Sequence, residues 1–215
     1  MPVEMQSTLE PRKTPVQARS TVTVEAIAEA AIQVLLSHGV ERLTTTRVAE
    51  RAGVSVGTLY QYYPNKQALL FAVLEAHLDK VTAVLSRACE ESYGLPIEPM
   101  VKHVIEAFVD AKMERTDVSM ALYKIAAELG GVKVVRSVGE RSHRTIEQML
   151  MTVPGGQFED VKFTARMMMA TMAGTTRNVL EAGATPALVK GLRKHLVLLC
   201  QSYLQSCNVG VALNM

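Results

Sequence analysis

Residues 43–70 read LTTTRVAERAGVSVGTLYQYYPNKQALL, and this stretch decides the fold. Its first part, residues 46–52, has the apolar spacing of a short amphipathic helix. Gly53 suits the left-handed residue that closes a helix, and Ser55 is a good N-cap for a second helix over residues 56–62. Two short helices joined by a tight glycine-containing turn predict a helix-turn-helix, whose second helix enters the major groove of DNA.

The face that this motif leaves outward is polar. Its hydroxyls and its amide come from Ser55, Thr58, Tyr60, Gln61 and Tyr62. Gly57 removes a side chain where a backbone must approach closely, and Lys66 is a cation of the kind that contacts phosphate. A helical corner that happens to be polar outside is the alternative interpretation, because short helix-turn-helix patterns also occur by accident.

The run from Gly39 to Leu70 resembles the DNA-binding domain of the TetR/AcrR family of bacterial transcriptional repressors. The matching pieces are Gly39-Val40, Thr44-Thr45-Thr46, Val48-Ala49, Ala52-Gly53-Val54-Ser55, Gly57-Thr58-Leu59-Tyr60, Tyr62-Tyr63 and Lys66. The polar face and this resemblance together predict DNA contacts by Thr44, Thr45, Thr46, Ser55, Val56, Gly57, Thr58, Tyr60, Gln61, Tyr62 and Lys66. Val56 departs from the family, in which many members carry a polar residue here, and its apolar side chain suits a thymine methyl better than a phosphate.

The charge balance limits how the chain can bind DNA. The 215 residues carry a formal net charge of +2, so the protein is not a polycation that coats nucleic acid. Residues 11–66 hold seven basic and four acidic side chains, and this excess of three permits DNA binding without requiring it. Residues 1–18, which include Arg12 and Lys13, are predicted to form a flexible basic arm that lies along phosphates or stays solvated.

Cysteine usage and apolar runs predict a cytoplasmic protein. Cys89, Cys200 and Cys207 have neither an even count nor the spacing of metal ligands, so we expect reduced thiols, with a redox-sensing cysteine as the less favoured alternative. No N-terminal segment combines a basic stretch with an apolar signal core, and no apolar run is expected to reach membrane-spanning length. We therefore predict no membrane partner.

Helical periodicity continues through the rest of the chain, without an alternating strand pattern. Besides the two short helices, we predict helices over residues 20–38 and 66–92, from Pro99, from Asp117 to Leu129, and over residues 132–152, 159–181 and 186–206. The predicted fold is all-α with about nine helices. A three-helix DNA-binding domain (19–65), which contains the helix-turn-helix, precedes a C-terminal helical bundle for ligand binding and dimerisation (66–215).

The last two predicted helices carry more apolar residues than one packing face requires. Such a helical pair buries its surplus in a partner, and pairing with its own copy gives a two-fold homodimer, as a palindromic operator requires. The alternative is that these helices lie in the core of a single chain, and the family resemblance favours the dimer. The predicted dimer interface consists of Met168, Met169, Met172, Thr176, Val179, Leu192, Leu196, Leu199 and Tyr203.

Catalysis is not predicted, because no enzyme motif is present. The histidines are scattered without an HxxxH pair, and there is no GxSxG, P-loop or dinucleotide fingerprint. Glu140, His143 and Glu147 share a helical face, which a solvated charged surface explains better than a metal site. We therefore predict no catalytic residue, no metal and no cofactor.

A small-molecule sensor is the function that fits the C-terminal half better than catalysis. The chain contains 12 methionines, whose flexible thioethers suit an adaptable apolar cavity. The resemblance to ligand-responsive repressors implies an effector pocket, for which the candidates are Phe108, Met113, Met120, Tyr123, Met149, Phe163 and Met167. Each of these residues also suits an ordinary position in a helical core.

The sequence thus predicts a DNA-binding transcriptional regulator, a homodimeric repressor that a small apolar effector releases from a double-stranded, palindromic operator. Two alternatives stay open. One is a regulator of the same fold without a small-molecule effector, controlled by a protein partner or architectural. The other is a helical ligand-binding protein that no longer binds DNA. The sequence names neither the effector nor the operator.

Overall fold

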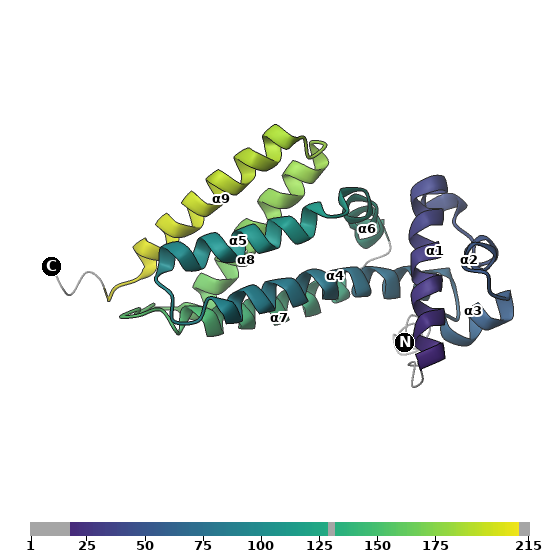
Figure 1. Cartoon of the computed structure of the whole chain (residues 1–215), viewed down its shortest axis with the longest axis horizontal. Coiled ribbons are helices and arrows are strands. Elements are labelled where there is room, and N and C mark those ends of the chain that lie inside the picture. Colours follow the sequence, from purple (N-terminus) through teal and green to yellow (C-terminus); the bar gives the residue numbers. More distant parts are fainter. Residues whose placement is uncertain (1–17, 129–131, 211–215) are drawn as a thin grey trace, which may run out of the picture. The chain divides into compact units, whose positions relative to one another are not determined.

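The computed structural model describes residues 18–128 and 132–210, and these ranges contain nine α-helices and no strand longer than an isolated bridge (Figure 1). The predicted all-α fold is confirmed. Residues 1–17, which hold nearly all of the predicted arm, lie outside the described ranges. The helices are α1 (Ala18–Arg42), α2 (Thr45–Ala52), α3 (Val56–Tyr62), α4 (Lys66–Glu91), α5 (Ile97–Met113), α6 (Thr116–Glu128), α7 (Val132–Leu150), α8 (Val161–Glu181) and α9 (Pro186–Cys207).

The helices form two compact units. The first comprises the described residues up to His77 and those of 120–134, and the second comprises 78–119 and the described residues from 135 onward. Helices α4, α6 and α7 therefore contribute residues to both units. The domain boundaries predicted after residues 18 and 65 stay predictions, since a compact unit does not by itself have an assigned function.

In the first unit, α1 and α2 pack together and bury an apolar core. The stripe of α1 that the sequence predicts enters this core through Ile27, Ala31, Val34 and Leu35. Gly39 was predicted to end this helix, and its φ of 76° and ψ of 170° do interrupt the regular helix before a last turn up to Arg42.

One stretch of the described residues, Ser20–Arg42 in α1, is long and apolar enough to cross a membrane by length and composition alone. This finding corrects the expectation that no apolar run reaches such a length. The core helix of a soluble protein passes the same test, and the buried face of α1 lies against α2. Packing within the unit therefore accounts for part of the apolar character of this stretch.

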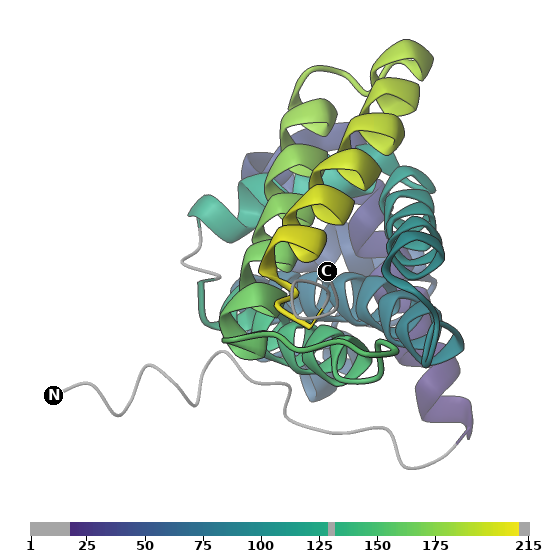
Figure 2. The ribbon, with the colours of Figure 1, turned by 90° about the vertical axis from the view of Figure 1, so that its left-hand side faces the viewer.

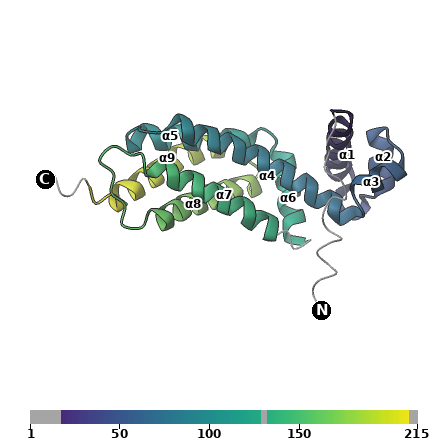
Figure 3. The ribbon, with the colours of Figure 1, turned by 90° about the horizontal axis from the view of Figure 1, so that it is seen from below.

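The second unit is built around one apolar cluster that receives side chains from α4, α5, α7, α8 and α9. Figures 2 and 3 show these five helices from two directions, with α8 and α9 running side by side and antiparallel. Helix α9 also packs along α5, where Arg193 Nη2 donates to Asp110 Oδ1 at 2.5 Å. Asn208, directly after α9, contacts the segment before α8, because its Oδ1 accepts a 2.9 Å hydrogen bond from the Gln157 N–H.

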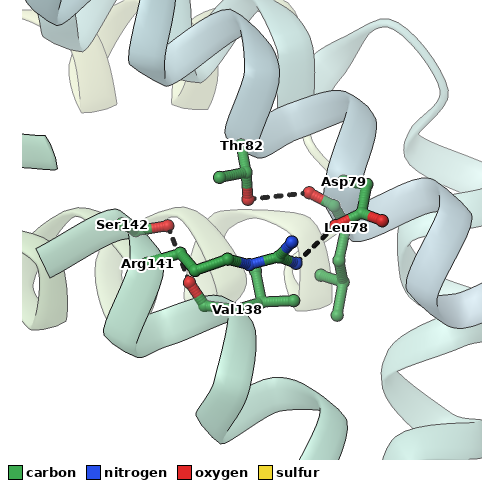
Figure 4. A network of polar contacts seen from close by, with 6 residues as sticks. All are labelled: Leu78, Asp79, Thr82, Val138, Arg141 and Ser142. Carbon is green, nitrogen blue, oxygen red and sulfur yellow. Dashed lines mark hydrogen bonds and ion pairs between the residues drawn. The ribbon is translucent and has the colours of Figure 1, made fainter. Parts of the chain in front are cut away.

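A polar contact joins α4 to α7 at the surface of this unit. Arg141 forms an ion pair with Asp79, and both side chains are about half exposed, at 48% and 47% (Figure 4). Thr82 and Ser142 beside them donate to carbonyls of their own helices, at 2.9 and 3.0 Å. The ion pair is thus the contact in this group that bridges the two helices.

Candidate nucleic-acid interface

The turn between α2 and α3 has the geometry that its sequence predicts. Gly53 is left-handed, with φ 68° and ψ 29°, and its N–H donates to the carbonyls of Ala49 and Glu50. Ser55 has extended backbone angles, and its Oγ accepts a 2.9 Å hydrogen bond from the Thr58 N–H. Both contacts satisfy backbone groups that helix ends leave unpaired, so they hold the end of α2 and the start of α3 in a defined turn.

Helix α3 has one buried face and one exposed face. Leu59 is fully buried, and Tyr63 directly after the helix is 4% exposed, so these two side chains anchor α3 to the unit. Burial, with a smaller effect of Tyr62, raises the pKa of the Tyr63 phenol, so this ring stays neutral at physiological pH. Of the predicted contact residues around α3, the exposed ones are Ser55, Gly57, Tyr60 and Gln61, and the half-buried ones are Val56, Thr58 and Tyr62.

The predicted threonines lie at the start of α2, next to α3. Thr45 Oγ1 and the hydroxyl of Tyr60 form a 3.1 Å hydrogen bond, which links the two helices. Thr44 caps α2 by accepting a 3.3 Å hydrogen bond from the Arg47 N–H. Thr44 and Thr46 are exposed, so the structure brings part of the threonine run and Tyr60 to neighbouring surface positions.

Lys66 makes a contact within the unit that the sequence pattern does not reveal. Its Nζ donates to the Val40 carbonyl at 2.5 Å, and the side chain is half-buried. Because Val40 follows the interruption of α1 at Gly39, this charge-assisted hydrogen bond completes a helix end. The predicted phosphate contact of Lys66 stays a prediction, and an alanine here would disturb the fold as well as any DNA contact.

Three exposed arginines near this surface were not among the predicted contact residues. Arg47 Nη1 donates to the Arg42 carbonyl at 2.8 Å, and Arg51 Nε donates to Gln33 Oε1 at 2.6 Å. Arg42 and Arg47 flank the exposed threonines Thr44 and Thr46 at the start of α2. The local charge excess in the sequence included them, but a charge count does not reveal on which face a cation lies.

The residues predicted for an effector pocket are divided between the two units. Met120 and Tyr123 belong to the first unit, and the others belong to the second. Phe108 and Met149 lie in the apolar cluster and Met113 packs against it, whereas Phe163 and Met167 are 55% and 39% exposed. The structure does not bring these last two into the interior, because their side of α8 lies opposite the buried side.

The residues predicted for a dimer interface also fall into two groups. Those buried in the second unit of this chain are Met168, Met172, Thr176, Leu192 and Leu196. Leu199 is 53% exposed, and Met169, Val179 and Tyr203 are half-buried. The buried group is used inside the chain because α8 packs against both α5 and α9. An interface that uses these helices must therefore be formed by their exposed neighbours.

Two of the thiols of the second unit, Cys89 and Cys200, are buried. Burial, with a smaller effect of Glu90, raises the pKa of Cys89 to about 12, and burial raises that of Cys200 to about 11. Both therefore stay protonated at neutral pH, which suppresses thiolate chemistry. In the described parts of the chain, no three His, Cys, Asp or Glu side chains come close enough together to hold a metal ion.

The fold and this site define a helix-turn-helix DNA-binding protein, and comparisons identify its family. Residues 27–73 match the family "Bacterial regulatory proteins, tetR family", and residues 96–204 match "Tetracyclin repressor-like, C-terminal domain". The chain belongs to the TetR family and is a DNA-binding transcriptional regulator. The resemblance seen in the sequence is thereby confirmed.

Individual relatives agree with this assignment. An uncharacterised HTH-type transcriptional regulator of Mycobacterium bovis is 25% identical over 183 residues, which cover 85% of this chain and 80% of that protein. The tetracycline repressor protein class C of Escherichia coli is 48% identical over 54 residues, 25% of each chain. The structure of FadR from Bacillus subtilis, solved with stearoyl-CoA, is 16% identical and covers 83% of this chain and 98% of its own, with a TM-score of 0.68. That last similarity shows a shared fold.

Proposed function

We propose that this regulator is a cytoplasmic, dimeric repressor that binds a palindromic operator through α3 and is released by a small apolar effector. The observation that carries the DNA-binding part is the capped helix-turn-helix, whose α3 is anchored by Leu59 and exposes Gly57, Tyr60 and Gln61. Residues 19–65 would form the DNA-binding domain, and residues 66–215 the effector-binding and dimerisation domain. The proposal assigns the chain no catalytic activity and no cofactor.

The first test is fluorescence-anisotropy binding to the DNA that flanks the gene, over a series of salt concentrations. We expect selective binding that weakens steeply with salt, because phosphate contacts release counterions. Gln61→Ala removes an exposed amide of α3, and Gln148→Ala is its control, because it removes an exposed amide of α7 in the second unit. Loss of affinity with the first variant alone supports the assigned surface, whereas equal affinity for both variants contradicts it.

The dimer interface that we propose uses the exposed side of the α8–α9 pair. Phe163, Met167, Ala170 and Gly174 lie on one exposed side of α8, and α9 exposes Leu188, Leu198 and Leu199. The two small residues allow a second helix to approach closely. Analytical ultracentrifugation should show a dimer for the parent chain and monomers for the variant Met167→Glu with Leu199→Glu. The control Gln148→Glu, at an exposed position of α7, should remain dimeric.

The release step would depend on α4, which contributes residues to both compact units. An effector that favours a dimer with wrongly spaced α3 helices weakens operator binding by roughly 5- to 150-fold, a coupling of about 1–3 kcal/mol. Thermal-shift screening detects compounds that bind the native state, and anisotropy then shows whether they release DNA. Stearoyl-CoA belongs in the screen because the FadR structure contains it. If no compound in the screen stabilises the protein or releases it from DNA, the protein would be a regulator without a small-molecule effector.

A further inference from the structure

The exposed side chains of α3 do not all point in the same direction. Leu59 is fully buried, and Gly57 and Gln61 each lie two residues from it, about 200° around a helix of 3.6 residues per turn. Both positions are exposed, so they stand opposite the side by which α3 packs on its unit. Gly57 and Gln61 therefore form the outermost strip of the helix, with no side chain at the first of them.

Gln61 differs from its neighbours in α3 by its lack of internal partners. The hydroxyls of Thr58 and Ser55 lie 2.8 Å apart, and the ring of Tyr62 contacts that of Tyr63, with centroids 6.5 Å apart. The amide of Gln61 makes no hydrogen bond to any described residue of the chain. Its carbonyl oxygen and both hydrogens of its nitrogen are therefore available to a ligand.

Tyr60, on the same exposed surface, is turned toward the other helix of the motif. Its hydroxyl lies 3.1 Å from Oγ1 of Thr45, the first residue of α2. In a helix-turn-helix, the second helix enters the major groove while the first helix crosses the sugar-phosphate backbone. A hydroxyl held beside the start of α2 is thus placed for a phosphate, which leaves Gln61 as the polar group aimed at base edges.

Gly57 is not required by the packing of the described residues. Its φ lies outside the left-handed range, and a Cβ at this position would meet only Ser55 Oγ, at 3.7 Å, which is an ordinary contact. Glycine also weakens a helix relative to alanine. The space that this glycine leaves open lies outside the protein, beside Gln61, where it allows a base pair to approach the backbone of α3.

We propose that Gln61 is the base-reading residue of α3, that it recognises adenine in the major groove, and that Gly57 gives the clearance for this contact. The inference deepens the proposed function and rests on it. Oε1 of Gln61 would accept from the N6 amino group of adenine, and Nε2 would donate to N7. Guanine offers two acceptors and cytosine one donor at this edge, so neither base satisfies both ends of the amide.

The experiment begins with the full-length parent protein and a library of randomised double-stranded DNA, from which the preferred site is selected. Each A·T pair in one half of that site is then replaced by G·C, and binding is measured by fluorescence anisotropy. At one of these positions, the parent should bind the substituted duplex about 5- to 150-fold more weakly. Gln61→Ala should bind both duplexes equally at that position and keep the parent's discrimination at the others.

Tyr60→Phe is the matched variant, because it removes a polar group from the same exposed surface of α3. It should weaken binding to every duplex by the same factor, about 2- to 10-fold, and keep the preference for adenine, since a phosphate contact carries no sequence information. Melting temperatures close to that of the parent show that both variants are folded, as expected for substitutions at exposed positions.

Gly57→Ala tests the clearance separately from the fold. Because the added methyl group meets no clash within the chain, the melting temperature should rise by about 1–4 °C. Binding to the selected site should weaken about 5- to 150-fold, the usual range for overpacking a fitted contact. A more stable protein with weaker DNA binding is a result that a structural role of Gly57 would not produce.

Each outcome decides the inference. It is overturned if Gln61→Ala keeps the parent's discrimination at every A·T pair, if Tyr60→Phe loses that discrimination, or if Gly57→Ala binds the site as tightly as the parent. In these cases the parent still selects a site, so the proposed function stands with another residue as its base reader. A parent protein that selects no sequence contradicts the proposed function and this inference together.

Discussion

The helix-turn-helix and the interior of the second unit place their polar groups by different means. At the turn between α2 and α3, the helix ends are capped by residues close in sequence, as when Ser55 Oγ accepts from the Thr58 N–H at 2.9 Å. In the second unit, Lys112 of α5 and Thr176 of α8 are buried by the packing of helices that are far apart in the chain. Helix caps are predictable from spacing along the chain, whereas burial of a polar side chain by packing is not.

The two regions also differ in how polar groups relate to stability. The caps of the helix-turn-helix stabilise the fold while leaving a polar surface exposed. The buried Thr176 hydroxyl makes no hydrogen bond, and burial lowers the pKa of Lys112, so burial of each of these groups carries a cost for the lost water. Four experiments test this contrast, in order of decreasing expected effect.

The largest effect is expected for Lys112→Met as a function of pH. The pKa of Lys112 is lowered from 10.5 to about 8 by burial, so the cost of burying the ammonium is fully present below pH 8 and disappears as pH rises toward 10.5. The variant lacks this cost of about 3 kcal/mol. The unfolding free energy of the variant minus that of the parent protein should therefore fall by about 2–3 kcal/mol between pH 7 and pH 10.

Denaturant titrations of both proteins at the two pH values measure this difference. The thiols of Cys89 and Cys200, whose pKa values are also displaced, are present in both proteins and cancel in the comparison. A difference between the proteins that stays constant with pH would show that Lys112 does not titrate as its burial requires.

The second effect concerns the left-handed turn at Gly53. Gly53→Val places a β-branched residue at φ 68°, which should cost at least about 1–2 kcal/mol and misplace α3. A Cβ at this position meets nothing within 4 Å, so the cost comes from the backbone conformation rather than from a clash. Gly53→Asn is the control, because asparagine tolerates this conformation. Equal melting temperatures and DNA affinities for the two variants would contradict the role assigned to the turn.

The third effect tests the cap of α3. Ser55→Ala removes the acceptor for the Thr58 N–H and should lower stability by about 1 kcal/mol, with weaker operator binding. Ser206→Ala is the control, because Ser206 Oγ donates to the carbonyl of Ser202 in its own helix and caps nothing. Thermal unfolding and anisotropy are measured for both variants. A larger loss with Ser206→Ala would show that local capping does not hold the helix-turn-helix.

The smallest effect is expected for the exposed ion pair between α4 and α7. A double-mutant cycle with Asp79→Ala and Arg141→Ala should give a coupling of about 0.2–1 kcal/mol that falls with added salt, because both side chains are half exposed. A coupling well above this range would show that α4 and α7 are held together by charge as well as by the apolar cluster.

Sequence reasoning located the helix-turn-helix closely because its signals are local. The predicted second helix, 56–62, has the bounds of α3, and the first differs from α2 by one residue, the start at Thr45. The target of Lys66 was missed, because the Val40 carbonyl becomes its neighbour only when α1 and α4 come together. Phe163, predicted for the pocket, is exposed on α8, and Met172, predicted for the dimer interface, is buried, which the sequence did not reveal because an apolar residue shows no preference between a core and a partner.

By itself, the sequence determined the helical class, the nine-helix layout and the motif that places the chain in its family. Caps, turns and helical periodicity act between residues within a few positions of each other, so they can be read along the chain. The tertiary structure alone decided which apolar side of α8 is buried, and that the polar side chains of Lys112 and Thr176 are buried. Burial depends on the summed contacts of several helices, and no spacing along one helix contains that information.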